Sequence, residues 1–457
     1  MNYYITKTPK TLEFAEKHLT YDNPNYQKAI KLGIPQARYI PKHIRLYKIY
    51  GNYISIPFGT YNYLKSKYGE NNSFKAPNVK YEGNINLYDY QRVAVDYMAN
   101  TTNCLLISST GSGKTQMGIA LIQKLGLRTL WITHTQDLLD QSKSRFLAHF
   151  KNEVGEIAEG KVNIQNITFA LIQTLSKIDL DLYRDMFDCI IIDEVQHCST
   201  NINNTTMYEK VLSHLDASYR YGLTATLHRA DGLEGVIRDL ISYNEYRVNE
   251  KDIKKLKASY KVIKYNEKPE KEVIGYNEYT CTEIKAYPYL DSDGTINYTK
   301  LINYLCNNEK RTQMLVDLVN KNKDRNIAIL TLRKSHCKRL NDLIDNSYYL
   351  DSNSPRNTRK RDLEVFRETR NKVFIATYQL AKEGLDIPNL DMLILATPVK
   401  DETILIQSIG RIERYQESKK TPIVYDIVDS EIGYCENLFK KNRKKILQKY
   451  NYVIEYL

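Results

Sequence analysis

The sequence predicts an α/β protein with two tandem lobes of parallel sheet and a small basic segment in front of them. Short apolar runs alternate with helical patterns from about residue 87 onward. This alternation indicates parallel strands that helices cover on both faces. A charged and less regular stretch, residues 248–308, interrupts the alternation once before it resumes. We therefore expect two lobes of similar size.

Ten short apolar runs are the strand candidates, because each is followed by a loop and a helical pattern. In the first lobe the runs are residues 103–109, 129–133, 166–172, 188–193 and 220–226. In the second lobe they are residues 326–332, 346–351, 372–377, 390–397 and 421–428. The expected domains are an N-terminal accessory domain over residues 1–80, a first lobe over 81–247, an inter-lobe connection over 248–308 and a second lobe over 309–457.

The bulk composition predicts a globular protein of the cytoplasm. Of the 457 residues, 42% are hydrophobic and 26% are charged, which is typical of soluble domains. No stretch approaches the roughly 18 consecutive apolar residues that a membrane helix needs, and the N-terminus lacks the apolar core of a secretory signal. The seven cysteines are scattered singly, so we expect neither a disulfide framework nor a zinc site.

Positive charge is concentrated at the N-terminus. The net charge is +12, and residues 1–80 contain 13 Lys and Arg against 4 Asp and Glu. Residues 38–68 also contain 7 tyrosines in 31 residues. Basic and aromatic residues together suit phosphate contact with base stacking, whereas tyrosines are equally typical of a small sheet whose interior they pack. The two interpretations are compatible, with tyrosines inside and lysines outside.

A glycine-containing loop, Ser108–Thr115, lies between a predicted strand and a predicted helix. That context is the one a phosphate-binding loop requires, although its first residue is serine where the strict pattern has glycine. Gly111 and Gly113 allow backbone N–H groups to turn toward phosphate oxygens, and the helix N-terminus adds its positive dipole end. Lys114 can reach the β- and γ-phosphates of ATP, and the Thr115 hydroxyl can ligate Mg²⁺.

Two neighbouring carboxylates, Asp193 and Glu194, end the apolar run 188–193. A carboxylate at the carboxyl end of a strand can hold Mg²⁺ through water, and an adjacent glutamate can orient the attacking water. An isolated pair of this kind is also common at helix N-termini. Its position 79 residues after Lys114, in the same predicted sheet, favours ATP hydrolysis.

Over about residues 87–415 the sequence resembles the DExH group of superfamily 2 helicases and translocases, whose fold is a pair of RecA-like lobes. The matching segments are Leu87–Gln91 (adenine recognition), Ser108–Thr115 (motif I), Thr133–Thr135 (Ia), Asp193–His197 (II), Thr224–Thr226 (III), Ile327–Leu332 (IV), Ala376–Pro388 (V) and Gln407–Arg414 (VI). They occur in the family's order, each in the expected kind of element. The resemblance implies an ATP hydrolase that uses Mg²⁺ and moves along or unwinds nucleic acid.

The resemblance also implies a role for each matching residue. ATP contacts are expected from Tyr88, Gln91, Ser109, Thr110, Gly111, Ser112, Gly113, Lys114, Thr115, Gly384 and Asp386, with Thr115 and Asp193 at Mg²⁺. Catalytic roles are expected for Glu194, Gln407, Arg411 and Arg414, and coupling to nucleic acid for His197, Thr224 and Thr226. By placement, DNA contacts are expected at Thr133, Arg229, Thr331 and Thr377.

A physical argument supports the arginine pair as well. Arg411 and Arg414 are three residues apart on a predicted helix, which would present neighbouring guanidinium groups. Phosphoryl transfer depends largely on positive charge at the γ-phosphate, and closure of the lobes would bring that charge to the nucleotide. The alternative is that both arginines form surface salt bridges.

The stretch Leu223–Gly232 narrows the resemblance to DNA motors. It is similar to DNA translocases related to the nucleotide-excision-repair helicases and to phage branch-migration helicases of the UvsW type, and the DEVQH form of motif II differs from that of DEAD-box RNA helicases. The resemblance implies forked or branched DNA as the substrate in recombination, replication or repair, in a T5-like bacteriophage and therefore in the host cytoplasm. Residues 1–80 are then expected to bind DNA and confer substrate choice. An RNA helicase, or a double-strand translocase that does not separate strands, stays open as an alternative.

Overall fold

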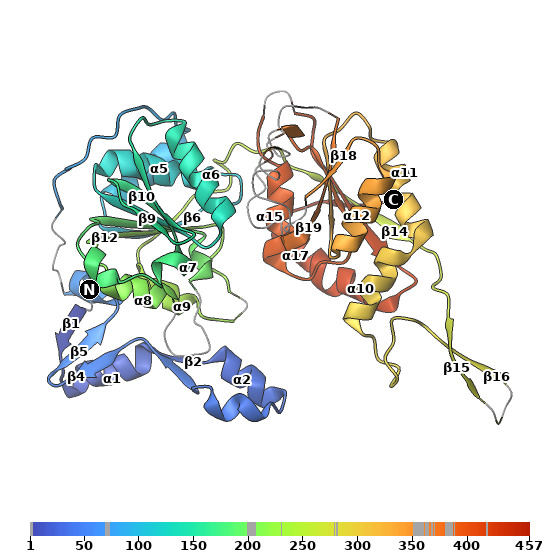
Figure 1. Cartoon of the computed structure of the whole chain (residues 1–457), viewed down its shortest axis with the longest axis horizontal. Helices are drawn as coiled ribbons and strands as arrows, with labels where there is room; N and C mark the ends of the chain where they lie inside the picture. The colour runs from blue at the N-terminus through green and yellow to red at the C-terminus, as the bar shows by residue number, and fades with distance from the viewer. Residues whose placement is uncertain are drawn as a thin grey trace. The chain divides into compact units, whose positions relative to one another are not determined.

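A computed structural model gives the structure of the chain (Figure 1). It describes all residues except 1–2, 69–73, 199–206, 230, 278, 280–281, 351–360, 362–364, 367–368, 370, 380–386, 388 and 417–418. The chain divides into two compact units, Met1–Ile253 and Lys254–Leu457. Each unit has its own parallel sheet and its own hydrophobic cores. Over the described residues, no helix is long and apolar enough to cross a membrane.

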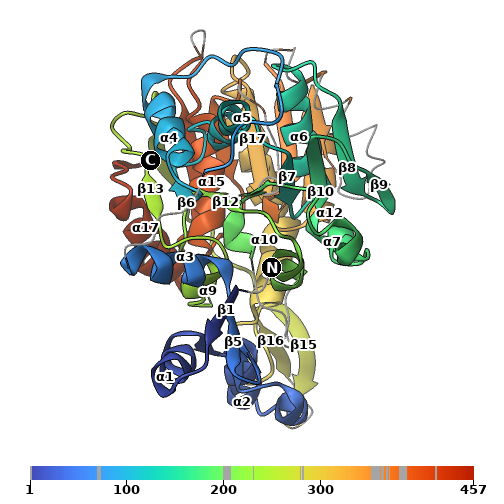
Figure 2. The same ribbon diagram turned by 90° about the vertical axis from the view of Figure 1, so that its left-hand side faces the viewer.

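An eight-stranded sheet forms the centre of the first unit, in the order β13-β6-β12-β11-β7-β10-β8-β9 (Figure 2). All neighbouring pairs are parallel except β8 with β9. The strands are β6 (Asn103–Ile107), β7 (Thr129–Thr133), β8 (Val154–Ala158), β9 (Lys161–Asn163), β10 (Ile167–Leu171), β11 (Cys189–Asp193), β12 (Tyr219–Thr224) and β13 (Glu245–Arg247).

Helices cover both faces of this sheet, which is why its central strands are apolar throughout. Successive side chains of a strand point to opposite faces, so Ile190 and Ile192 of β11 join one core while Cys189 and Ile191 join the other. The helices are α4 (Asp89–Ala99), α5 (Lys114–Leu125), α6 (Gln136–Leu147), α7 (Ile172–Leu175), α8 (Met207–His214) and α9 (Glu234–Leu240), with short 3₁₀ turns at Leu180–Tyr183 and Val195–His197.

The N-terminal segment of this unit is a small mixed α/β structure. Its strands are β1 (Tyr3–Thr6), β2 (Thr20–Asp22), β3 (His43–Arg45), β4 (Lys48–Tyr50) and β5 (Tyr53–Ile56), and its helices are α1 (Pro9–His18), α2 (Pro24–Lys31), the 3₁₀ turn Pro35–Tyr39 and α3 (Phe58–Lys67). The strands form two antiparallel sheets, β1-β5-β4 and β2-β3. Five of the seven tyrosines between residues 38 and 68 are exposed, so interior packing does not account for their enrichment.

A buried carboxylate fixes the N-terminal segment to helix α9. Asp239 accepts hydrogen bonds from the hydroxyls of Tyr21 (2.5 Å), Thr60 (2.7 Å) and Tyr243 (2.6 Å). Helix α3 approaches α9 so closely that a Cβ on Gly59 would lie 2.0 Å from the Arg238 carbonyl oxygen. The segment is therefore packed into the first unit.

The second unit contains a seven-stranded parallel sheet in the order β18-β19-β17-β20-β21-β14-β22. The strands are β14 (Ser259–Tyr265), β17 (Ile327–Thr331), β18 (Ser347–Tyr349), β19 (Val373–Thr377), β20 (Met392–Leu395), β21 (Ile423–Asp429) and β22 (Ile454–Tyr456). The helices are α10 (Tyr298–Asn307), α11 (Glu309–Asn320), α12 (Lys334–Leu343), α15 (Glu402–Ile412), α16 (Gly433–Leu438), a π-helical turn at Phe439–Arg443 and α17 (Lys444–Lys449). A hairpin of β15 (Glu272–Asn277) and β16 (Thr282–Ala286) precedes α10 (Figure 1).

All ten predicted strands are present, with ends that differ by at most two residues from those expected. The structure departs from the expected connection over 248–308, because β14 from this stretch pairs with β21 inside the second sheet. Tyr260 and Val262 of β14 are fully buried, while lysines at 261 and 264 alternate with apolar residues. The charged runs at 251–257 and 267–272, on either side of β14, gave the stretch the composition of a linker.

Candidate active site

The order of the first sheet brings four predicted motifs to one edge. Strands β6, β12, β11 and β7 are consecutive and parallel, so their carboxyl ends point the same way. The phosphate loop follows β6, motif III follows β12, the acidic pair ends β11, and motif Ia follows β7. Ligands of parallel α/β sheets bind at this carboxyl edge. Residues from four separate parts of the sequence therefore meet at one site.

Two left-handed glycines shape the phosphate loop. Gly111 and Gly113 both have φ of +84°, a conformation that side chains disfavour. Helix α5 begins directly afterward at Lys114. The buried Lys114 Nζ donates to the carbonyl oxygens of Ser108 (3.1 Å) and Ser109 (3.4 Å). A helix N-terminus with a lysine at its start is a favourable environment for phosphate.

The side chain expected to recognise adenine also holds the phosphate loop. The Gln91 amide nitrogen donates to the Ser112 carbonyl oxygen (2.9 Å), and its amide oxygen accepts the Tyr88 N–H (3.0 Å). The Tyr90 hydroxyl donates to the same Ser112 carbonyl at 2.8 Å. Tyr88 stacks on Tyr90 with ring centroids 5.9 Å apart, and a Cβ on Gly113 would meet the Gln91 amide at 2.3 Å. Helix α4 and the loop are therefore fastened together.

The remaining loop residues differ in exposure. Ser112 is fully buried and its hydroxyl accepts a hydrogen bond from the Ser108 hydroxyl at 2.6 Å. Ser109 and Thr110 are half-buried. The tip of the loop is thus the part open to a ligand, while its base is internally bonded.

Asp193 and Glu194 have opposite pKa shifts. The buried Asp193 carboxylate accepts the Glu194 N–H at 3.0 Å. Burial and the Glu194 charge raise the pKa of Asp193 to about 6, against the influence of Lys114. Burial also acts to raise the pKa of Glu194, but the Lys114 charge and a hydrogen bond from Gln196 outweigh it and leave that pKa lowered. Glu194 is therefore ionised at neutral pH, which is the state that a general base needs.

A chain of side-chain hydrogen bonds connects motif II to motif III. The Gln196 amide nitrogen donates to Glu194 Oε2 at 2.6 Å, and the Thr224 hydroxyl donates to Gln196 Oε1 at 2.6 Å. The Thr224 hydroxyl also accepts the Thr226 N–H at 3.1 Å. Thr224 and Gln196 are both buried, and the Thr226 carbonyl oxygen, also 2.6 Å from the Thr224 hydroxyl, is the second acceptor for its single hydrogen. We call Glu194, Gln196 and Thr224 the motif II–III relay.

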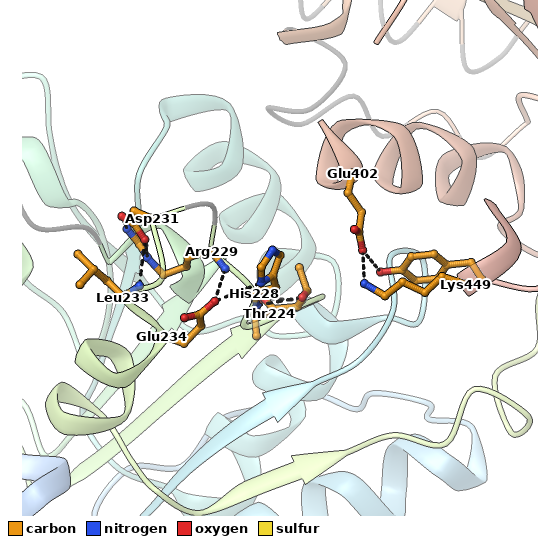
Figure 3. A network of polar contacts seen from close by, with 10 residues as sticks. Thr224, His228, Arg229, Asp231, Leu233, Glu234, Glu402 and Lys449 are labelled. Carbon is orange, nitrogen blue, oxygen red and sulfur yellow. Dashed lines mark hydrogen bonds and ion pairs between the residues drawn. The ribbon is translucent and has the colours of Figure 1, made fainter. Parts of the chain in front are cut away.

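Arg229 is a structural bridge in this structure, which differs from the DNA contact expected of it (Figure 3). Its side chain is only 8% exposed and forms an ion pair with Asp231. The same guanidinium donates to the backbone carbonyl oxygens of Gln196 and Cys198. The Glu234 carboxylate accepts the Arg229 N–H at 2.8 Å. These bonds attach the loop after motif III to motif II. They also use the guanidinium N–H groups of Arg229 that would otherwise donate to a DNA phosphate.

In motif Ia, Thr133 and His134 have different surroundings. Thr133 is fully buried and its hydroxyl donates to the Thr135 carbonyl oxygen at 3.2 Å, so it does not reach the surface as a DNA contact would. His134 stacks on His197 of motif II, with ring centroids 3.8 Å apart. The stack connects the residue after β7 to the turn that follows the neighbouring strand β11.

In the second unit, Thr331 and Thr377 are paired neighbours at the carboxyl ends of β17 and β19. Thr377 is half-buried, whereas Thr331 is fully buried and its hydroxyl lies 2.9 Å from His336 Nδ1. Thr331 is therefore part of the interior, which differs from the expected DNA contact. Gly384 and Asp386 of motif V lie outside the described residues.

Only the first part of motif VI lies in a helix. Gln407 is buried in α15 and Arg411 lies in its last turn. The helix ends at Ile412. Arg414 follows it and its backbone forms an isolated antiparallel β-bridge with that of Lys255. This corrects the expectation of two arginines on one helical face. The end of the helix is fixed by Glu413, whose buried carboxylate accepts the Ala258 N–H at 2.9 Å.

The donor set at the sheet edge suits Mg²⁺. Among the described residues, no group of three or more His, Cys, Asp or Glu side chains is gathered to hold a metal. Mg²⁺ requires only one or two protein oxygens beside phosphates and waters. The Thr115 hydroxyl in the first turn of α5 and the Asp193 carboxylate at the end of β11 are oxygen donors of this kind.

The sequence did not single out Gln196, Tyr90 or His134, although each lies within a recognised motif. In the structure, the side chain of each of these residues contacts a residue of another motif. Gln196 lies between the selected residues Glu194 and His197, and Tyr90 lies between the selected residues Tyr88 and Gln91. The bonds of all three cross between strands or helices, and a linear motif carries no such information.

Two family models match the chain, one on each lobe. The model described as the res subunit of type III restriction enzymes matches residues 84–229, and the helicase conserved C-terminal domain matches residues 310–416. Together they span more than half of the chain and contain every motif named above. The chain belongs to superfamily 2 of the helicases. It consists of two RecA-like lobes with an N-terminal segment packed on the first.

Viral and archaeal proteins of this superfamily are similar over most of their length. A protein of Acanthamoeba polyphaga mimivirus named an ATP-dependent RNA helicase is 29% identical over 91% of this chain and 79% of its own. A helicase of Escherichia phage T5 is 24% identical over 71% and 67% of the two chains. The DNA 3′-5′ translocase XPB2 of Sulfurisphaera tokodaii is 23% identical over 75% and 82%.

Solved structures share the fold. The structure of Dbp5 of S. cerevisiae bound to RNA and ADP BeF3 superimposes with a TM-score of 0.56 over 81% of this chain and 89% of that chain, at 15% identity. At this identity the likeness shows the two-lobe fold alone.

Proposed function

We propose that this superfamily 2 protein is an ATP-dependent DNA helicase or translocase that acts on forked or branched DNA. The observation that carries the proposal is the motif II–III relay. It runs from Glu194, the expected base, through Gln196 to Thr224 without a gap longer than a hydrogen bond. A rearrangement of motif III on nucleic acid would thus change the orientation of the carboxylate that acts on water.

Each part of the nucleotide site has a defined task in this proposal. The loop Ser109–Thr115 binds the phosphates through its N–H groups and Lys114. Asp193 and Thr115 would hold Mg²⁺, which screens the phosphate charge when bound. Glu194 orients the attacking water and accepts its proton.

The second lobe completes the proposed catalytic set. Arg411 and Arg414 would supply positive charge to the γ-phosphate in the transition state, a contribution on the order of 10³–10⁵ in rate for arginines of this kind. The neutral Gln407 amide would contribute a hydrogen bond. Because Arg414 lies beyond the end of α15, we expect Arg411 and Arg414 to contribute unequally.

DNA is the proposed polymer because of a relative that the chain matches, and the charge on the chain suits a nucleic acid of either kind. The XPB2 relative is named a DNA translocase, and residues 1–80 carry 13 Lys and Arg against 4 Asp and Glu. An RNA helicase is the second candidate, since the mimivirus relative is named one. A translocase that moves on duplex DNA without separating strands is consistent with the XPB2 name too.

The proposal is tested by ATPase rates with single-stranded DNA, duplex, fork, four-way junction and RNA, using Glu194→Gln as the inactive control. Stimulation by forks or junctions, lost in the variant by about 10²–10⁴-fold, is the expected result. Stimulation by RNA alone would replace DNA by RNA in the proposal. ATPase that no nucleic acid changes would overturn it.

Strand separation is measured separately. Displacement of a labelled strand from a fork identifies a helicase, whereas displacement of a triplex-forming strand without unwinding identifies a double-strand translocase.

A further inference from the structure

The three-stranded sheet β1-β5-β4 has one largely interior face and one largely exposed face, although Ile49 of the inward rows is 47% exposed and Ser55 of the outward rows is 5% exposed. Tyr3, Ile5, Ile54 and Ile56 face inward and join the core of the first unit. On the opposite face the strand register sets Thr6, Tyr53 and Tyr50 in one row. Tyr4, Ser55 and Lys48 form the next row.

Large aromatic rings are unusually accessible on that opposite face. Tyr4 is 53% exposed, Tyr50 is 48% exposed and Tyr53 is 54% exposed. Tyr4 and Tyr50 meet edge to face, with ring centroids 5.9 Å apart. Rings that support each other in this way are held in place on a rigid sheet. We call Tyr4, Thr6, Lys48, Tyr50 and Tyr53 the tyrosine face.

A pocket adjoins the tyrosine face. Lys48 and Ser55 line it together with Lys210, His214 and Arg220 from the RecA-like lobe. Its charged groups are three cations, Lys48, Lys210 and Arg220, against the single carboxylate of Glu209. The pocket is therefore net positive, and it is continuous with the exposed rings through Lys48.

Arg220 is a buried cation whose hydrogen bonding is incomplete. Its side chain is fully buried, lies over the Phe58 ring at 4.3 Å and donates through Nη2 to the Leu215 carbonyl oxygen at 3.0 Å. Its Nε has no hydrogen-bond partner within the part of the chain that the structure describes. An unpaired donor on a buried charge is costly, and Arg220 is among the residues that line the pocket.

The combination of exposed rings and a cationic pocket matches the chemistry of an unpaired nucleotide strand. Bases stack on aromatic side chains without regard to sequence, and the backbone phosphates follow positive charge. Duplex bases have their faces covered by their neighbours and cannot stack on protein rings in this way. The surrounding segment favours a polyanion, because residues 1–68 contain 11 Lys and Arg against 3 Asp and Glu.

We propose that the tyrosine face and the adjoining pocket bind single-stranded nucleic acid. Bases stack on Tyr4, Tyr50 and Tyr53, and a backbone phosphate enters the pocket beside Lys48 and Arg220. This site deepens the proposed function and rests on it, because it names the unpaired arm of a fork as the part of the substrate that the N-terminal segment holds. It is separate from the ATP site at the carboxyl edge of the sheet.

The test is binding of full-length protein to fluorescein-labelled oligo(dT), oligo(U) and a blunt duplex by anisotropy, without nucleotide. Tyr53→Ser is expected to weaken the dissociation constant for the single strands about tenfold, since one stacked base contributes ~1–3 kcal/mol. Tyr53→Phe keeps the ring and is expected to stay within about twofold of wild type. Circular dichroism and thermal unfolding verify that the variants fold.

Salt dependence tests the phosphate contact. Lys48→Gln is expected to lower the slope of log Kd against log salt by about 0.7 for single strands, the value for one lost phosphate contact. Lys31→Gln, an exposed lysine on α2 outside the tyrosine face, is the matched control and is expected to leave the slope nearly unchanged.

The outcomes separate this site from the motor. If Tyr4, Tyr50 and Tyr53 all changed to Ser leave single-strand affinity and salt slope unchanged while forks still stimulate the ATPase, the site is wrong and the proposed function stands. If the triple variant loses binding but no nucleic acid stimulates wild-type ATPase, the site stands and the proposed function fails. Wild-type binding to duplex alone would overturn the site.

Discussion

Replacing Thr224 by Val interrupts the motif II–III relay with little change of shape. The substitution removes the hydroxyl that donates to Gln196 Oε1 and accepts the Thr226 N–H. Both Thr224 and Gln196 are buried, so the Gln196 amide oxygen is left without a donor. We expect a loss of about 1–3 kcal/mol in the free energy of unfolding, the cost of an unsatisfied buried polar group.

The effect on catalysis should exceed what stability alone explains. Without Thr224, the Gln196 amide can rotate, and the Glu194 carboxylate that accepts its N–H loses a fixed orientation. Misplacement of a catalytic group by a fraction of an ångström costs on the order of tenfold or more in kcat. We expect Thr224→Val to lower nucleic-acid-stimulated kcat about tenfold, which corresponds to ~1.4 kcal/mol in activation free energy, with a smaller change in KM.

A matched variant separates the relay from general destabilisation. Thr168 is also a fully buried strand threonine, and its hydroxyl bonds to the backbone of Gln165 at 2.9 and 3.1 Å. Thr168→Val should therefore cost a similar free energy in urea unfolding while kcat stays at the wild-type value. If the two variants lose stability equally and Thr224→Val keeps wild-type kcat, the relay has no catalytic role.

Three further predictions concern stability. Arg311→Met should lower the free energy of unfolding by about 3–5 kcal/mol in urea, because the buried Asp429 carboxylate loses its bidentate partner; an unchanged midpoint would contradict the pair. Burial, with smaller effects from nearby arginines, lowers the pKa of His336 to about 3 from 6.5, so the unfolded state binds the extra proton between these values. Stability should then fall as pH drops from about 6.5 toward 3, by up to ~1.4 kcal/mol per pH unit, and His336→Gln should flatten that dependence. Tyr21→Phe removes a hydroxyl from Asp239 and should speed limited proteolysis of residues 1–68 about tenfold, for a hydrogen bond of ~1–2 kcal/mol to a charged group.

The sheet strands were predictable because burial on both faces leaves an unbroken apolar run. Within the two large sheets five strands were missed, β8, β9, β13, β14 and β22, and none of them has such a run. In β14 the lysines at 261 and 264 interrupt the apolar pattern although Tyr260 and Val262 are fully buried. Long lysine side chains can bury their stems and keep the charge in water, so composition alone could not separate this strand from a linker.

The phosphate loop and the acidic pair were predictable for a different reason. Their chemistry is local: left-handed glycines at 111 and 113, a lysine at a helix start and a carboxylate at a strand end all lie within a few residues. A side chain must be exposed to contact DNA, and a sequence motif does not specify how exposed its side chains are. Thr133 and Thr331 proved fully buried, because the last residue of a central strand is still covered by the helices that flank the sheet.

Arg229 shows how a motif residue can hold two loops together in this structure. An arginine followed two residues later by aspartate was expected to face the nucleic-acid path, yet the aspartate is the arginine's own partner. The remaining donors bind the carbonyl oxygens of Gln196 and Cys198, so the loop after motif III is fixed to the backbone of the residue at the centre of the relay. Gln196 is thus held by its side chain to Glu194 and Thr224 and by its backbone to Arg229. A movement of this loop cannot leave Gln196 in place unless one of these bonds breaks, and Gln196 is in turn bonded to the Glu194 carboxylate.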